Sequence, residues 1–122
     1  MTIIDAINKT DTLKPNGYTQ SEKVAWLSTL DGMIKRTLLD NYEGDEIPFG
    51  GYNDDTPLTT QLLVEEPYSE LYVFWLEGKI DYANGELDKY NNSALRFNDT
   101  YSEFRNYYNH THMPKGSGIR YF

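Results

Sequence analysis

A chain of 122 residues with 39% hydrophobic and 25% charged side chains is long enough for one globular domain with a modest core. Its net charge is −8 and it has no basic run, which argues against binding the outside of a nucleic-acid duplex, because phosphates are neutralised by Lys and Arg. The lack of cysteine excludes disulfides and thiol chemistry. We expect no signal peptide and no membrane span, and therefore synthesis in the cytoplasm.

Two helices are predicted in the first third of the chain. Thr2 is suited to cap a short helix over residues 2–13, which ends at the turn-forming residues Lys14–Gly17. A capping-box pattern at Thr19–Glu22 predicts the start of a second helix that runs to about residues 39–42. Its apolar face is wide, which is typical of a helix buried among others. The largest members of that face are Trp26, Leu27, Leu30 and Ile34.

Glycine, proline and other turn-forming residues dominate residues 43–66. Ile47–Tyr52 and Thr60–Val64 are compatible with a short β-hairpin, and otherwise the segment is a loop at about residues 45–65. A loop of about 20 residues is unusual inside a compact domain, and it is usually either functional or disordered. An arm that contacts a partner and a mobile surface loop both fit. The residues expected in such a partner contact are Phe49, Tyr52, Asp54 and Asp55.

The stretch from Pro67 to His110 carries an unbroken helical pattern. Its positions at spacings of three and four are all apolar or aromatic, from Val73 to Tyr108. Asn84-Gly85 is a stop signal inside it, so the pattern fits either one long helix or two helices in a hairpin. A continuous helix would be about 66 Å long, whereas a compact chain of this size has a radius of gyration of about 14 Å.

A continuous helix would protrude from its own subunit. Its far half would then pack on neighbouring copies, or on the helix over residues 2–13 folded back onto it. In a hairpin the far half would be covered within the chain. The predicted self-association surface consists of Leu87, Tyr90, Ala94, Phe97, Tyr101, Phe104 and Tyr108.

These patterns predict an all-α fold, a small helical bundle with one long C-terminal helix that is continuous or broken at Asn84-Gly85. We expect a single helical domain over residues 1–112 and a flexible tail over residues 113–122. The candidate docking residues of that tail are Ile119, Tyr121 and Phe122. The predicted core joins the apolar face of the second helix to Leu71, Trp75, Leu76 and Ile80.

Few residues of the sequence are candidates for a catalytic or metal-binding site. His110 and His112 lie at the expected end of the long helical segment, where helix capping is favoured over metal binding. Glu77 and Asp81 share a helix face, and a solvated face is favoured over an acid–base pair. The chain has no Gly-x-Ser-x-Gly, no phosphate-binding loop and no HExxH motif. We therefore expect no enzyme activity, no metal and no cofactor.

Several short motifs carry a resemblance to a known family. In chain order they are KPNGY at 14–18, KVAWL at 23–27, LDG at 30–32, PYSELY at 67–72, IDYANGE at 80–86, YNN at 90–92, FN at 97–98, YYN at 107–109 and THMP at 111–114. In these motifs the chain resembles head–tail connector (adaptor) proteins of tailed phages and prophages of Gram-positive bacteria. The resemblance covers about residues 13–114, and none of its motifs is catalytic.

This resemblance implies a virion structural protein that assembles as a homo-oligomeric ring between the portal and the tail. Its partners would be further copies of itself, the portal, and the tail or a second adaptor protein. DNA would pass through the lumen without sequence-specific binding, and no membrane would be involved. The protein would be found in the host cytoplasm during assembly and then in the virion. The alternative is a small acidic protein-binding module, a regulator or nucleic-acid mimic that binds a basic partner.

Overall fold

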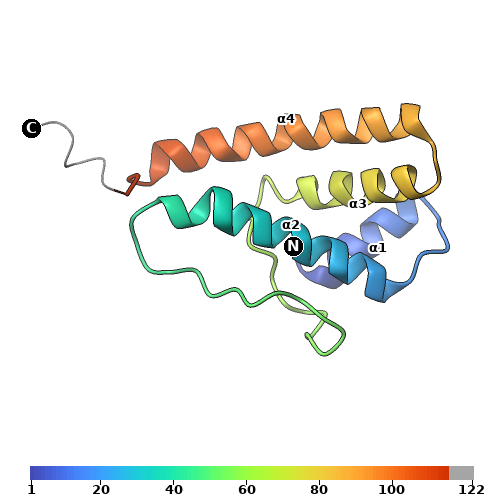
Figure 1. Cartoon of the computed structure of the whole chain (residues 1–122), viewed down its shortest axis with the longest axis horizontal. Helices are drawn as coiled ribbons and strands as arrows, with labels where there is room; N and C mark the ends of the chain where they lie inside the picture. Colours follow the sequence, from blue (N-terminus) through green and yellow to red (C-terminus); the bar gives the residue numbers. More distant parts are fainter. Residues whose placement is uncertain (116–122) are drawn as a thin grey trace, which may run out of the picture.

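The computed structural model describes residues 1–115, and they form a bundle of four α-helices (Figure 1). α1 (Ile3–Leu13) and α2 (Gln20–Thr37) are followed by a 3-10 turn, η1 (Leu39–Asn41), and then by α3 (Glu70–Ala83) and α4 (Leu87–Thr111). α3 is the central helix, because it packs against α1, α2 and α4. The prediction of a small all-α bundle with a long C-terminal helix is confirmed.

The first two helices begin at the predicted caps. The Asp5 N–H donates to the Thr2 hydroxyl oxygen at 3.2 Å, and the Thr2 N–H donates to the Asp5 carboxylate at 3.1 Å, which completes a capping box. At α2 the Glu22 N–H donates to the Thr19 hydroxyl oxygen at 3.1 Å. The Glu22 carboxylate accepts from the Thr19 hydroxyl at 3.2 Å. These contacts satisfy amide groups that the first helical turn leaves without partners.

The chain reverses between α3 and α4, so the hairpin is correct and the continuous helix is wrong. Gly85 has a φ of +74°, a left-handed conformation that glycine adopts without a steric penalty. The Glu86 N–H donates to the Asp81 carbonyl at 2.9 Å, and the Gly85 N–H donates to the Tyr82 carbonyl at 3.0 Å. This is a Schellman motif, which ends α3 and turns α4 back along it (Figure 1).

Of the two alternatives for the segment at about residues 45–65, the loop is confirmed and the short β-hairpin is wrong. Residues 42–69, called the arm from here on, contain no strand, and Ile47–Tyr52 and Thr60–Val64 do not pair with each other. The arm instead crosses the start of α1, where the Ile3 N–H donates to the Thr60 carbonyl and the Ile4 N–H to the Leu58 carbonyl, both at 3.0 Å. The carbonyl groups of the arm therefore satisfy amides at the N-terminus of α1.

The core forms where α1, α2, α3 and the arm meet, and α4 closes one side. The predicted core is confirmed for the residues with nearly no exposed surface, which are Leu27, Leu30, Ile34, Leu71, Leu76 and Ile80. Trp26 and Trp75 are half-buried at its edge instead. The arm adds Leu62 and Val64, which the sequence patterns did not place in the core.

The first three residues of the predicted flexible tail, 113–115, are bound to the bundle. The Glu43 N–H donates to the Met113 carbonyl at 2.7 Å, and the Lys115 N–H donates to the Asn41 carbonyl at 2.9 Å, so residues 113–115 are held against the end of η1. The candidate docking residues Ile119, Tyr121 and Phe122 lie outside the described residues. Within residues 1–115 no helix combines the length and the apolar character needed to cross a bilayer.

The half-buried Trp75 supplies a test of the contact between α2 and α3. Its indole Nε1–H donates to the Trp26 carbonyl at 2.9 Å, and its ring lies 5.3 Å from that of Phe97. We expect Trp75→Phe to lower the free energy of unfolding by about 1 kcal/mol, because the ring contact is kept and one hydrogen bond is lost. Urea denaturation followed by circular dichroism measures this. Trp26→Phe is the control: it shortens a tryptophan in the same way, but the hydrogen bond to Trp75 stays, because the acceptor is the backbone carbonyl of residue 26. Equal stability of wild type and Trp75→Phe would contradict the prediction.

Candidate interaction surface

The structure divides the predicted self-association surface of α4 into a covered part and an open part. Phe104 and Tyr108 are buried within the chain, with exposed fractions of 2% and 9%. Tyr68 packs on Phe104 at 5.7 Å and Tyr42 on Tyr108 at 5.0 Å between ring centroids. These two positions therefore have partners within the chain, which come from the two ends of the arm. Leu87 is exposed, and the remaining members, Tyr90, Ala94, Phe97 and Tyr101, are half-buried.

A groove of about 580 Å³ lies over the open part, between the C-terminal half of α3 and the N-terminal half of α4. We call it the α3–α4 groove, and its lining includes Met33, Trp75, Tyr82, Tyr90, Ala94 and Phe97. Gly78 lies between the two helices, where an added Cβ would come within 3.7 Å of Ser93 Cβ. A methyl group there would make an ordinary van der Waals contact, so the position tolerates a small side chain. The Lys79 ammonium lies 4.7 Å from the centre of the Trp75 ring and gives the groove a cationic edge.

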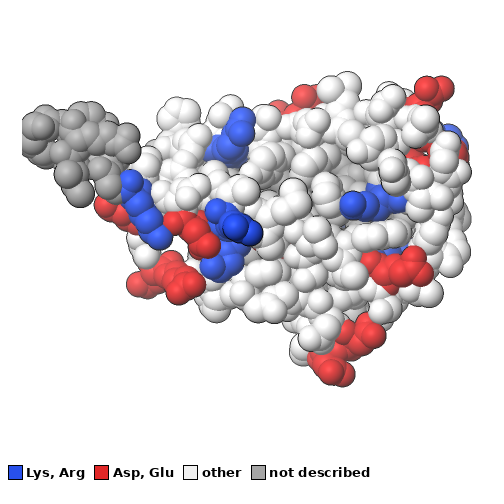
Figure 2. All heavy atoms as spheres, in the orientation of Figure 1, with Lys and Arg blue, Asp and Glu red and all other residues white. Residues whose placement is uncertain are grey.

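Exposed apolar side chains continue from the groove onto the surface. Met33, Tyr82 and Leu87 expose between 48% and 65% of their surface. On the face drawn in Figure 2, most acidic side chains lie toward the edge, and separate basic side chains interrupt a broad uncharged area in the middle. An apolar surface that borders a groove is typical of an interaction site.

The arm uses its aromatic residues within the chain and leaves its acidic residues outside. Phe49 packs edge-on against Tyr52 at 5.0 Å, and a Cβ added at Gly32 of α2 would lie 3.6 Å from Phe49. Asp54 accepts from the Ser21 hydroxyl at 2.7 Å, and both Asp54 and Asp55 are exposed. Of the predicted partner contacts, the two aspartates are therefore accessible and the two aromatic residues anchor the arm to α2.

A buried carboxylate holds the arm in place. Asp31 has no exposed surface and accepts from the Tyr52 and Tyr72 hydroxyls, both at 2.5 Å, and from the Leu63 N–H at 3.1 Å. The Tyr72 hydroxyl in turn accepts from the Val64 N–H at 2.8 Å. Burial raises the pKa of Asp31, and burial together with the Asp31 charge raises the pKa of Tyr72 well above its usual range. Because all these donors belong to the chain, the carboxylate is a structural anchor.

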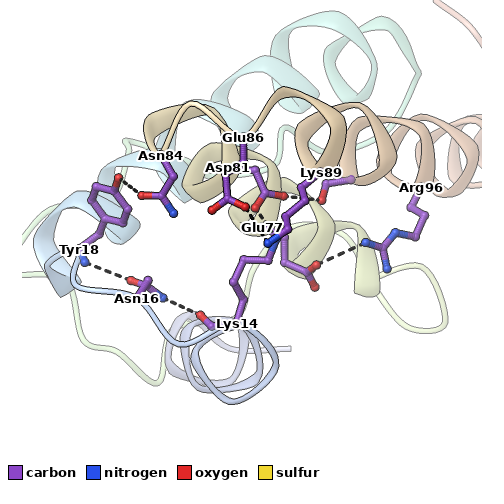
Figure 3. Close-up of polar contacts among 10 residues, drawn as sticks. Lys14, Asn16, Tyr18, Glu77, Asp81, Asn84, Glu86, Lys89 and Arg96 are labelled. Atoms are coloured by element: carbon purple, nitrogen blue, oxygen red, sulfur yellow. Dashed lines mark hydrogen bonds and ion pairs between the residues drawn. The ribbon is translucent and has the colours of Figure 1, made fainter.

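The expectation that Glu77 and Asp81 form a solvated face is wrong. They expose only 6% and 1% of their surface, because α4 folds back over α3. Figure 3 shows Asp81 paired with Lys14 and Glu77 paired with Arg96, the latter at 3.5 Å. Asp81 also accepts from the Ser93 hydroxyl at 3.1 Å. Each carboxylate has its own cation, so this arrangement joins helices and does not form an open acid–base pair.

The two histidines lie at the end of α4, as the sequence pattern indicates. His110 Nδ1 lies 2.7 Å from the Asn106 carbonyl oxygen. The His112 ring stacks on Tyr108 with 3.7 Å between centroids. Among residues 1–115, no group of three or more His, Cys, Asp or Glu side chains is arranged to hold a metal ion.

Comparison of this chain with known protein families, with curated proteins and with solved structures gave no match. Its function is therefore argued from its own residues and from the motifs described above. The surface of the described residues that best fits an interaction is the α3–α4 groove with its exposed apolar border.

Proposed function

We propose that this protein is a virion structural protein, a head–tail connector subunit that assembles as a ring between the portal and the tail of a phage. The observation that supports this proposal most is the α3–α4 groove. Large apolar surface exposed to water is unfavourable, and a groove with aromatic walls is typical of a surface that another chain covers. The half-buried members of the predicted self-association surface that line it are Tyr90, Ala94 and Phe97.

The motifs that carry the resemblance support the same role. Lys14 and Asp81, from two of these motifs, pair with each other between the end of α1 and α3. Tyr18 donates to the Asn84 side chain at 2.6 Å, and Asp31 anchors the arm (Figure 3 shows the first two contacts). These residues fix how helices and loops meet. A structural subunit depends on such contacts, whereas an enzyme would also need reactive groups open to a substrate.

The charge of the protein fits a channel that DNA passes through. A net charge of −8 repels phosphates, so a ring of such subunits would let DNA slide without holding it. Acidic residues such as Asp54 and Asp55 are exposed on the arm. The same charge is the feature that favours the alternative, an acidic module that binds a basic protein.

Co-expression with the portal and adaptor proteins encoded by neighbouring genes tests the proposal. We expect the protein to co-purify with the portal as a ring that is visible by electron microscopy. Ala94→Asp places a charge in the α3–α4 groove and should abolish the ring, because an unpaired carboxylate would be buried at the subunit contact. Asn92→Asp is the matched control, because Asn92 is exposed on the same helix and does not line the groove.

Both variants should melt at the temperature of the wild type. Failure to bind any portal or adaptor protein would overturn the connector role. Capture of a basic protein by the monomer, with no ring, would support the acidic binding module instead. Rings that form equally with Ala94→Asp would show that a different surface joins the subunits.

A further inference from the structure

We propose that Ile119, Tyr121 and Phe122 of one copy bind in the α3–α4 groove of a second copy. This contact rests on the proposed function, because the ring supplies the neighbouring copy. The segment would cover the apolar groove that the bundle leaves open. The contact would make each subunit both a donor of its C-terminal segment and an acceptor for another.

The groove has the size and the lining that such a segment requires. Its volume of about 580 Å³ lies within the range of pockets that enclose small ligands. Aromatic rings from both helices, Trp75 on α3 with Tyr90 and Phe97 on α4, form its walls. Aliphatic and aromatic side chains are the natural occupants of such a pocket, because burying each of them is favourable.

The segment after Lys115 has the matching composition. Gly116, Ser117 and Gly118 form a linker of small residues, and they are followed by three apolar side chains among the next four residues. Arg120 and Lys115 give this segment a positive charge in a chain with a net charge of −8. The net negative charge of a second copy attracts the segment over longer distances, whereas binding in the groove itself depends on the apolar side chains, because the charged residue of its lining is Lys79.

The geometry favours a second copy over the same chain. The segment leaves the bundle at Lys115, which is bound to Asn41 beyond the end of α4. Phe122 is seven residues further on, and an extended chain of that length spans about 25 Å at most. Tyr90, at the far end of the groove, lies 21 residues before Thr111, which is about 31 Å along the helix. The chain's own segment can reach only the near part of its groove, whereas a neighbour can approach from the other end.

Photo-crosslinking of the full chain tests this inference. One copy carries the photoreactive p-benzoylphenylalanine in place of Tyr121 and is mixed with a ¹⁵N-labelled copy without it. The mixture is irradiated at high concentration, and also within the portal-bound complex. We expect mass spectrometry to find crosslinks from position 121 to residues 74–82 or 90–98 of the labelled copy.

Matched variants of the labelled copy decide whether the groove is the site. Ala94→Trp fills the groove and should reduce the intermolecular crosslinks about tenfold or more, the effect of losing one buried aromatic side chain. Asn92→Trp adds the same side chain on an exposed part of α4 and should leave the crosslinks unchanged. Phe122→Asp in the photoreactive copy should reduce them as Ala94→Trp does. Circular dichroism confirms that each variant is folded.

Three results would overturn the inference. These are crosslinks confined to the same copy, crosslinks to a different surface of the second copy, and crosslinks that Ala94→Trp leaves unchanged. A portal-bound ring without crosslinks to the groove would leave the connector role standing and reject this contact. Crosslinks to the groove in a protein that binds no portal would support this contact and reject the connector role.

Discussion

Replacing Asp31 with Ala is expected to lower the free energy of unfolding by about 3–5 kcal/mol. The buried carboxylate accepts from the hydroxyls of Tyr52 and Tyr72 and from the Leu63 N–H. Without it these donors have lost their acceptor in the interior, and each such group costs about 1–3 kcal/mol. The small cavity left by the side chain adds to this effect.

Urea denaturation of the two proteins, followed by circular dichroism, measures the difference. Asp40→Ala is the control, because the Asp40 side chain is 42% exposed and Lys35 keeps a second carboxylate, Glu46, at 3.6 Å, so a smaller change is expected. Hydrogen exchange adds a local readout: amide protection in the arm, above all at Leu63, should fall in Asp31→Ala. A loss of stability no greater than that of the Asp40 control would refute the anchoring role of Asp31.

The same pair of proteins should differ in how stability depends on pH. Burial raises the pKa of Asp31 above its ordinary value, and the hydrogen bonds that it accepts only partly oppose this. The folded protein therefore binds this proton more readily than the unfolded chain. The part of the stability that comes from this pKa difference is complete below about pH 4 and is lost as the pH rises through the raised pKa, whereas the hydrogen bonds to Tyr52, Tyr72 and Leu63 remain. The difference in free energy of unfolding between wild type and Asp31→Ala should therefore become smaller as the pH is raised from about 4 to 7. A difference that becomes larger over this range would mean that the pKa of Asp31 is lowered in the folded protein.

Local signals in the sequence predict where helices begin, and distant contacts decide the rest of the fold. Thr2 and Thr19 cap helices because their hydroxyls bind amides within the next turn. The break at Gly85 was ambiguous, since the helical spacing of apolar residues continues through it. The structure has the hairpin because α4 packs along α3. The spacing of apolar residues predicts an apolar face on each helix, but it does not predict which other helix covers that face. The choice between a loop and a hairpin for the arm was open for the same reason, because the carbonyl groups of the arm accept from amides at the start of α1.

The interaction surface was only partly predictable. Tyr90, Ala94 and Phe97 were expected on one apolar face, and they line the groove. Phe104 and Tyr108 were expected there too, but the chain covers them itself with aromatic residues that lie more than 30 positions earlier. Tyr82 was outside the expected surface, although it forms part of the groove.

The buried polar residues could not be recognised from their own positions. Asp31 lies beside Leu30 at the edge of the apolar face of α2, which is a signal that it turns inward. Its two tyrosine partners are 21 and 41 residues away, so the sequence pattern does not name them. Asp81 was assigned to a solvated face because that assignment is correct for a charged residue on an isolated helix. Here a second helix covers it.

Replacing Lys14 with Met is expected to lower the free energy of unfolding by about 3 kcal/mol. Lys14 pairs with Asp81, whose side chain is only 1% exposed. Removing the cation leaves a buried carboxylate that keeps its hydrogen bond from the Ser93 hydroxyl but has lost its paired charge. Breaking a buried pair on one side is more destabilising than replacing both partners, because the remaining charge stays desolvated.

A double-mutant cycle separates this effect from the loss of the lysine side chain itself. Asp81→Asn in the Lys14→Met background should restore part of the stability, because the neutral amide no longer needs a cation. Lys9→Met is the matched control: Lys9 also joins α1 to a carboxylate of α3, that of Glu70, but both side chains are largely exposed, so little change is expected. Urea denaturation of the wild type, Lys14→Met, Asp81→Asn, the double variant and Lys9→Met gives the comparison. Equal losses for Lys14→Met and Lys9→Met would show that burial of Asp81 does not govern this contact. A large loss for Lys14→Met alone, relieved by Asp81→Asn, would establish that the turn after α1 is held to α3 by a buried charge pair.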